Sequence, residues 1–314
     1  MMIDIMTPAN IVCPLLILMA IGYYLKRVGM LNDAVIVKMN RIVFHLFIPA
    51  LMFSNIFNTD IQEIGDLSYL IFGVISVLTI FGLSWLLVPR FVKDEAKCGV
   101  VIQGIYRSNY VLMGIAICSS LYGAENIGAA AILIALVVPI YNMLAVLILN
   151  VYNKNGRKSL GKTLLDIVKN PIIIAAVLAI VLRLLHVQLP RMVSSVVNDL
   201  SKLATPLALI LLGGFFRFDF SSINRKCIIW VMIMKILVIP TIFVIISVLL
   251  GFTGVELAAL MVMFIAPCAV SMFTMAQEMG GDSELACQLV VISSTISGIT
   301  MFLWILVLNT LGLL

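Results

Sequence analysis

The sequence predicts an all-α polytopic membrane protein with ten transmembrane helices, and three observations lead to this fold class. First, 63% of the 314 residues are hydrophobic and 11% are charged, with a mean hydropathy of +1.19. A soluble domain carries roughly 45–50% apolar and about 25% charged residues. Second, apolar stretches able to cross a bilayer, which takes about 20 residues, recur along the whole chain. Third, these stretches lack the polar–apolar alternation of membrane-barrel strands.

Charged residues delimit ten apolar stretches, which we number as spans 1 to 10 in chain order. Their bounds are 5–25, 42–59, 67–89, 98–124, 126–153, 170–182, 203–216, 227–255, 257–277 and 285–314. Arg107 interrupts span 4 and Lys235 interrupts span 8, while spans 6 and 7 are short. The flanking Lys169, Arg183 and Lys202 lengthen the short spans, because long basic side chains reach from a helix end to the membrane surface.

Basic residues gather in alternate loops, and this predicts the orientation. If the N-terminus is outside, the inner loops hold 15 of the 20 Lys and Arg residues, and the outer loops hold Arg183, Arg191 and Lys202. The positive-inside rule then places both termini outside the cytoplasm, in a multi-pass protein of the cell (plasma or inner) membrane. The net charge of +5 is thereby explained by topology, so we expect no nucleic-acid partner.

The longest polar stretch divides the chain into two halves of five spans. The expected units are a first five-helix repeat, a cytoplasmic linker and a second repeat, at residues 1–153, 154–169 and 170–314. Span 2 carries Asn40 followed by Pro49, and span 7 carries Asn198 followed by Pro206. Because five is odd, the second half enters the membrane from the opposite side. This inverted repeat is typical of secondary transporters; the alternative is chance similarity between leucine-rich helices.

Two spans contain residues that predict a break in the helix. Span 9 holds Pro267 in its middle, and proline removes a backbone donor and clashes with the preceding turn. Span 4 holds Arg107, Ser108 and Asn109, followed by Gly114. If these equivalent spans cross, their helix ends form a site able to hold an anion. The alternatives are a plain kink at Pro267, a snorkelling Arg107, and a helix–helix hydrogen bond from Asn109.

Other polar residues within the spans each have two interpretations. Lys235 neutralises an anionic substrate or pairs with a carboxylate, and His45 is a proton switch or a packed histidine. Gln103 and Ser271 line the site or link helices. A polar cluster in span 10 favours close helix packing over a cation site; its members are Ser293, Ser294, Thr295, Ser297 and Thr300. An inner loop after span 9 holds acidic residues that we expect to be solvated: Glu278, Asp282 and Glu284.

Residue types that would indicate an enzyme or a bound cofactor are missing from the sequence. The six cysteines form no CxxC pair, and two histidines are too few for a structural zinc site. No nucleotide-binding, zinc-protease or serine-hydrolase motif occurs. We therefore expect no metal, no cofactor and no enzymatic activity, with coupling to protons, sodium or the membrane potential left open.

Several segments, in order along most of the chain, carry a family resemblance. They are Asn40-Arg41-Ile42-Val43-Phe44, Ile48-Pro49-Ala50-Leu51, Arg107-Ser108-Asn109-Tyr110, Gly114-Ile115, Val138-Pro139-Ile140-Tyr141-Asn142, Asn170-Pro171, Ala204-Thr205-Pro206-Leu207-Ala208-Leu209, Ala266-Pro267 and Gly281-Asp282. The chain resembles bacterial members of the auxin efflux carrier family, which are related to the PIN-formed carriers and to malonate transporter-like permeases. No single segment is specific to this family, but together the segments make the resemblance strong.

The resemblance implies how the ten helices divide and where a substrate binds. Spans 1, 2, 6 and 7 would form a scaffold that dimerises, and spans 3–5 and 8–10 a transport domain that moves against it. Substrate would bind where broken spans 4 and 9 cross. The family's span-4 asparagine corresponds to Asn109, its span-9 proline to Pro267, a lining position to Val270 and a polar span-5 position to Asn142. The family's Gly-Ile-Pro is here Gly114-Ile115-Ala116, so the span-4 break would rest on Gly114 and the polar residues before it, or be milder.

The function predicted from these features is secondary active transport of a small organic anion such as a carboxylate. The spans hold few acidic groups, so a cationic substrate would lack a partner. We expect elevator-type alternating access by a homodimer in the lipid bilayer; the alternative is a ligand-binding membrane sensor that does not transport. The candidate substrate-binding residues are Asn109, Pro267, Val270, Asn142, Gly114, Ser271, Arg107 and Lys235.

Overall fold

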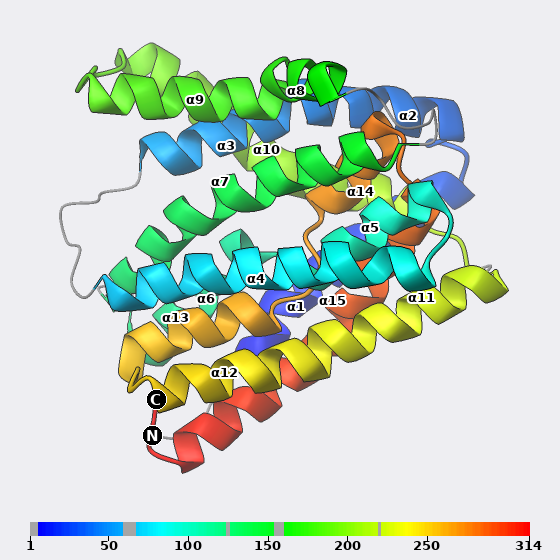
Figure 1. Ribbon diagram of the computed structural model, residues 1–314. Helices are drawn as coiled ribbons and strands as arrows, with labels where there is room; N and C mark the ends of the chain where they lie inside the picture. Colours follow the sequence, from blue (N-terminus) through cyan, green and yellow to red (C-terminus); the bar gives the residue numbers. More distant parts are fainter. Residues whose placement is uncertain (1–5, 59–66, 124–125, 154–159, 219–220) are drawn as a thin grey trace.

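The computed structural model describes residues 6–58, 67–123, 126–153, 160–218 and 221–314. Every named element in these residues is a helix, and the one β-bridge recorded among them joins Ser108 to Cys268. The predicted all-α class is therefore confirmed. The helix axes are roughly aligned, and the helices pack side by side (Figure 1).

The first half of the chain forms eight elements. They are α1 (Met6–Arg27), α2 (Asp33–Ile42), the π-helical turn η1 (Val43–Phe47), α3 (Ile48–Phe57), α4 (Ser68–Phe91), α5 (Glu95–Tyr106), α6 (Tyr110–Tyr122) and α7 (Gly128–Val151). The elements α2, η1 and α3 follow one another without a gap. Pro49 is the second residue of α3, where its missing N–H is tolerated because the preceding π turn has already altered the hydrogen-bond ladder.

The second half begins with a helix inside the predicted linker. Its elements are α8 (Leu160–Val168), α9 (Pro171–Leu184), α10 (Arg191–Phe215), α11 (Ser222–Met232), the π-helical turn η3 (Ile233–Val238), α12 (Ile239–Leu249), α13 (Gly254–Ile265), α14 (Ser271–Met279) and α15 (Ser283–Thr310). Again a proline, Pro240, is the second residue after the π turn, so α11, η3 and α12 form one continuous helix.

Seven helices of the described residues are long and apolar enough to cross a membrane. They contain α1, α2–η1–α3, α4, α7, α10, α11–η3–α12 and α15. Three predicted spans contain shorter apolar helices instead, because span 6 is the 14-residue α9 and spans 4 and 9 are each divided in two. The protein is thus a multi-pass helical membrane protein, while the count of ten crossings and the inverted repeat stay predictions.

Several helices begin earlier than the charge-delimited spans predict. Span 2 was bounded at residue 42, but its helix begins at Asp33, and span 7 was bounded at residue 203, but α10 begins at Arg191. The cause is that charged residues such as Lys38 and Lys202 end an apolar window without ending a helix. Lysine and arginine are good helix formers, so a helix continues past the apolar part.

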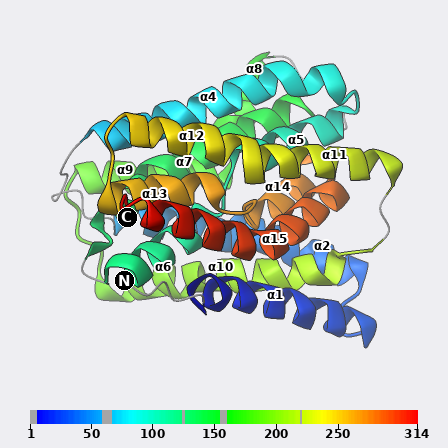
Figure 2. The same cartoon turned by 90° about the horizontal axis from the view of Figure 1, so that it is seen from below.

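The helices form two groups that also contact each other, with α1 packing on α15. The beginning of α1 lies at the same end of the molecule as the end of α15 (Figure 2). In one group α1 packs on α10, and α3 packs on α9 and α10. In the other group α4 packs on α5 and α7, α13 on α6 and α12, and α14 on α15. Helices α1 and α10 approach closely at Gly22 and Gly213, where an added Cβ would lie 1.9 Å from a backbone oxygen of the opposite helix.

Candidate functional site

Two helix breaks meet in the interior of the molecule. The first lies between α5 and α6, at residues 107–109, and the second between α13 and α14, at residues 266–270. Ser108 and Cys268 form an antiparallel bridge, and the backbone N–H of Asn109 donates to the carbonyl of Pro267 at 2.7 Å. The two predicted breaks therefore exist, and their extended segments cross.

The local sequence explains why each helix stops. Pro267 excludes its neighbour from the helical region, and Ala266 accordingly adopts φ −61° and ψ 144°. No proline ends α5, but Arg107 has φ −91° and ψ 118°, and its side chain turns to polar partners. Backbone groups released by the breaks are used again: the Cys268 N–H donates to Ser293 Oγ at 3.0 Å. Helix α6 continues through Gly114, so the first break rests on the polar run at 107–109.

The positive ends of two helices point into this crossing. Helix α6 begins at Tyr110 after Asn109, and α14 begins at Ser271 after Val270; neither preceding side chain caps its helix. The first N–H groups of a helix lack partners within the helix and carry partial positive charge. The Asn109 side-chain N–H₂ is buried without a hydrogen-bond partner among the described residues. At α14 the N–H groups of Met272 and Phe273 already donate to the carbonyls of Ala269 and Val270. The donors that the described residues leave open at the crossing are therefore mainly those of the first turn of α6 and the Asn109 amide.

The Arg107 guanidinium is buried, with 3% of the residue exposed, and joins three elements at the crossing. Its Nη2 donates to Asn142 Oδ1 of α7 at 2.6 Å and to Ser271 Oγ of α14 at 2.8 Å. Its Nη1 donates to Gln103 Oε1 of α5 at 3.1 Å and lies 2.9 Å from Met275 Sδ. These partners are neutral, so they satisfy the donors without cancelling the charge.

Among the described residues, no Asp or Glu lies within 4.0 Å of Arg107, since the ion pairs found there involve other basic residues. A buried charge is normally paired because isolating it from water is costly. Arg107 is thus a cation whose compensating anion is not supplied by the described part of the chain.

A cavity of about 70 Å³ lies beside the crossing, large enough for several water molecules or a small carboxylate. One side is formed by the broken helices and α7, and the other by α3 and α10. The polar residues that line it are Asn55, Arg107, Ser108, Asn109, Tyr110, Tyr141, Asn142, Thr205 and Ser271. The rest of the lining is mainly aliphatic, so the few polar groups determine what binds.

Five of the eight predicted site residues line this cavity: Arg107, Asn109, Asn142, Val270 and Ser271. Pro267 lies behind the lining and contributes its carbonyl to the crossing. Gly114 is one turn into α6 and packs under the ring of Tyr110, where an added Cβ would lie 2.7 Å from Cε2. Lys235 is buried on η3 and is not part of the lining.

Sequence reasoning missed two polar residues on the opposite side of the cavity, Asn55 and Thr205. Thr205 lies in a segment that carries the family resemblance, and Asn55 is a polar residue inside span 2, so both were visible as candidates. Of the residues with two interpretations, Gln103 contacts Arg107. His45 lies exposed on η1 with Nδ1 2.9 Å from the carbonyl of Arg41. Four hydroxyls of the span-10 cluster donate to carbonyls of their own helix, as Ser297 does to Ser294, and Ser293 also accepts from Cys268 at the crossing.

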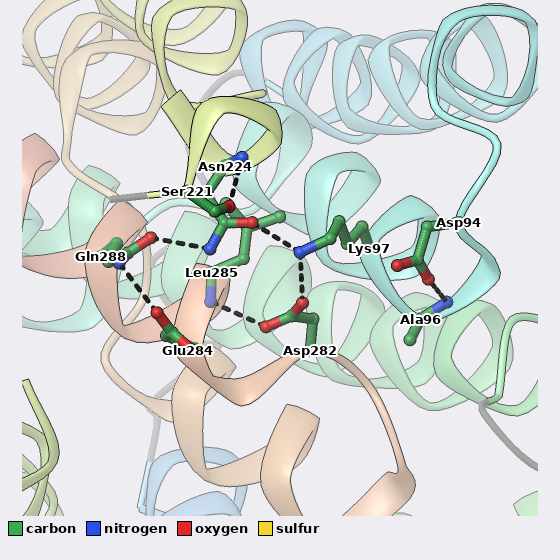
Figure 3. Close-up of polar contacts among 9 residues, drawn as sticks. All are labelled: Asp94, Ala96, Lys97, Ser221, Asn224, Asp282, Glu284, Leu285 and Gln288. Atoms are coloured by element: carbon green, nitrogen blue, oxygen red, sulfur yellow. Dashed lines mark hydrogen bonds and ion pairs between the residues drawn. The ribbon is translucent and has the colours of Figure 1, made fainter. Parts of the chain in front are cut away.

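Of the three acidic residues after span 9 that were expected to be solvated, Glu284 is exposed, whereas Asp282 and Glu278 are largely buried. The Asp282 side chain is 15% exposed, accepts from the N–H of Leu285 at the start of α15, and pairs with Lys97 of α5 at 2.6 Å. Lys97 also donates to Asn224 of α11, which in turn donates to Gln288 of α15 (Figure 3). Glu278 is also largely buried and pairs with Arg41 at 3.5 Å. The network in Figure 3 ties α5, α11 and α15 together at one end of the molecule.

A family model described as a membrane transport protein matches residues 9–305 of the chain. The chain belongs to this membrane transport protein family. The match confirms the auxin efflux carrier relationship predicted from the dispersed segments. Because it covers nearly the whole chain, the crossing and the cavity both lie within the part that the family shares.

Two members of the family are similar to this chain along almost their whole length. An uncharacterized transporter of Methanothermobacter thermautotrophicus is 24% identical over 301 residues, which cover 95% of this chain and 97% of that protein. An uncharacterized transporter of Methanocaldococcus jannaschii is 25% identical, covering 95% of this chain and 98% of that protein. Together with the helical fold, the family establishes a membrane transporter.

Proposed function

We propose that this transporter is a secondary active carrier of a small organic anion such as a carboxylate. The observation that supports this most is the charge of Arg107. It is buried beside the cavity, and all of its hydrogen-bond partners in the described residues are neutral. An anion in the cavity would supply the missing compensation, whereas a cation would add to the repulsion.

The anion would bind through groups that are already oriented. The N-terminus of α6 offers N–H groups, and Asn109 offers a buried amide that has no partner in the described residues. Such preformed donors favour negative charge at a helix N-terminus. Asn142 and Ser271 hold the guanidinium in place. No catalytic group, metal or cofactor is required for this role.

The mechanism that we propose is elevator-type alternating access. Ten crossings in two inverted repeats would form a dimerising scaffold of α1, α2–η1–α3, α9 and α10, and a transport domain of the remaining membrane helices. The support is the position of the cavity, which lies between α3 and α10 on one side and the crossing on the other. Contacts such as Asn40 Nδ2 to the Thr274 carbonyl at 3.3 Å, between α2 and α14, would change during the movement. The protein would lie in the cell membrane with both termini outside the cytoplasm.

The test is uptake of labelled acetate, malonate and indole-3-acetate into proteoliposomes that contain the purified protein. We expect uptake of at least one carboxylate above empty vesicles, reduced about 10- to 100-fold by Arg107→Gln, because charge-assisted hydrogen bonds contribute roughly 1.5–3 kcal/mol. Arg191→Gln removes an exposed arginine at the start of α10 and serves as the matched control. Arg107→Lys, which keeps the charge, should retain part of the activity.

The proposal is contradicted if folded wild-type protein takes up none of these carboxylates, or if Arg107→Gln transports them at the wild-type rate. Folding is checked by the melting temperature and by a single peak in size-exclusion chromatography. Saturable binding of a carboxylate without uptake would indicate the sensor instead.

A further inference from the structure

A second buried cation, Lys235, lies close to the crossing but outside the cavity. It is 2% exposed and belongs to η3, the π turn that joins α11 to α12. In the described part of the chain, its ammonium makes no hydrogen bond and no ion pair. The prediction that it pairs with a carboxylate is therefore not met within those residues.

The position of Lys235 relative to the cavity follows from Cys268. Cys268 lies close enough to Lys235 for its ionisation to affect the amine, and the Cys268 Sγ donates to the Gly104 carbonyl at 3.4 Å. The Cys268 side chain thus faces α5 and η3, whereas the next residues of the same extended segment, Ala269 to Ser271, line the cavity. The same segment therefore lines the cavity at Ala269 to Ser271 and approaches Lys235 at Cys268.

Few charged groups approach Lys235 from the elements packed against η3, which are α5, α11, α12, α13 and α15. Toward the crossing, α5 ends in Tyr106 and Arg107, and α13 is followed by Cys268. Helix α12 carries no titratable residue. The remaining charged groups lie near the other ends of those helices: Glu95, Lys97, Arg225, Lys226, Glu256 and Glu284. Lys235 and Arg107 are therefore two buried basic groups for which the described residues supply no nearby carboxylate.

We propose that Lys235 is the proton-carrying group of this transporter, and that it binds a proton when an anion enters the cavity and releases it when the anion leaves. This inference rests on the proposed function and names the proton as the ion whose movement is coupled to transport of the anion. An ammonium buried without a carboxylate is costly, and an anion on the other side of the backbone segment offsets that cost. In the empty cavity the neutral amine avoids the cost of a buried charge. The substrate then moves as an anion together with a proton, rather than with a sodium ion.

The experiment measures protons bound together with a probe anion, using malonate and acetate on purified full-length protein. Titration calorimetry in buffers of different ionisation enthalpy gives the number of protons taken up on binding, between about pH 6.5 and pH 9. We expect uptake approaching about one proton per anion, so that binding weakens by up to about tenfold per pH unit as the pH rises.

Two substitutions of Lys235 separate proton coupling from a merely structural role. In Lys235→Met the side chain is always neutral. The affinity of this variant for the anion should therefore be independent of pH and close to the weak value that wild type reaches at high pH. Lys235→Arg stays charged, so its affinity should also be independent of pH but close to the strong value that wild type reaches at low pH. Lys202→Met, at an exposed lysine of α10, should behave as wild type.

Each outcome has a distinct meaning. Proton uptake that is lost in both Lys235 variants, with affinities at the two different levels, supports the inference. Binding without proton uptake, or uptake that persists in Lys235→Met, overturns the inference and leaves the proposed anion transport intact. If folded wild-type protein binds neither malonate nor acetate, the proposed function itself fails for these carboxylates, and the inference fails with it.

Discussion

At the scale of single residues, the Arg107–Asn142 contact allows the buried charge of Arg107 to be compensated by a substitution that keeps the side-chain shape at position 142. Asn142→Asp would place a carboxylate 2.6 Å from the guanidinium. The new ion pair compensates Arg107, so we expect carboxylate binding to fall at least about tenfold. The lost bond from Asn142 Nδ2 to the Val138 carbonyl costs about 1 kcal/mol, so the melting temperature should stay within about 5 °C of wild type.

The control for this substitution is Asn126→Asp, which adds the same negative charge at an exposed position far from the cavity. Thermal-shift titration with malonate measures the effect in both variants, because a ligand that binds the native state raises its melting temperature. An Asn142→Asp protein that binds malonate as tightly as wild type would show that the charge of Arg107 does not attract the anion.

Asn109 carries a different prediction, because its side chain does little for the folded state. Its N–H₂ group is buried without a partner in the described residues, so Asn109→Ala removes an unsatisfied donor rather than a bond. We expect a melting temperature equal to or above that of wild type, together with a clear loss of carboxylate uptake. Loss of folding in this variant would mean that the amide has a structural role. Wild-type uptake would remove Asn109 from the site.

At the scale of helices, the contact between α1 and α10 depends on glycine. A Cβ at Gly213 would lie 1.9 Å from the carbonyl oxygen of Met19, so the two backbones must separate when alanine is introduced. We expect Gly213→Ala to destabilise the protein by about 1–3 kcal/mol, the usual cost of overpacking. The free energy of unfolding in detergent, from denaturant titration, measures this change.

The matched control is Gly82→Ala in α4, where an added Cβ meets no atom within 4 Å. Alanine has the higher helix propensity, so this variant should be neutral or more stable by up to about 1 kcal/mol. Equal effects at the two glycines would contradict the close approach of α1 and α10.

The helices also show what the sequence can and cannot predict. Pro267 has a strong local effect, and the break at 266–270 was predicted from it. The break after Tyr106 has no proline, and its polar run at 107–109 predicted it because such residues are costly in lipid. The start of α2 at Asp33 was missed because a charged residue ends an apolar window but does not end a helix. The pairing of Asp282 with Lys97 was missed because it joins residues far apart in the chain.

At the scale of the whole molecule, the cavity could be predicted only in part. The residues of the broken helices were visible as polar groups in apolar surroundings, and five of the eight candidates line it. The opposite side, formed by α3 and α10, depends on how two groups of helices pack. Asn55 and Thr205 were missed for this reason. Which face of a membrane helix meets a neighbour is decided by packing, because lipid and protein interiors are similarly apolar.

The measurement that tests the central claim most directly compares a carboxylate with its uncharged amide. Uptake of labelled malonate into proteoliposomes is measured against unlabelled malonate and against malonamide, which resembles it in shape but has no charge. Because the buried Arg107 has no carboxylate partner among the described residues, we predict that malonate competes and malonamide does not. Equal inhibition by the two compounds would contradict the conclusion that the cavity selects a negative charge.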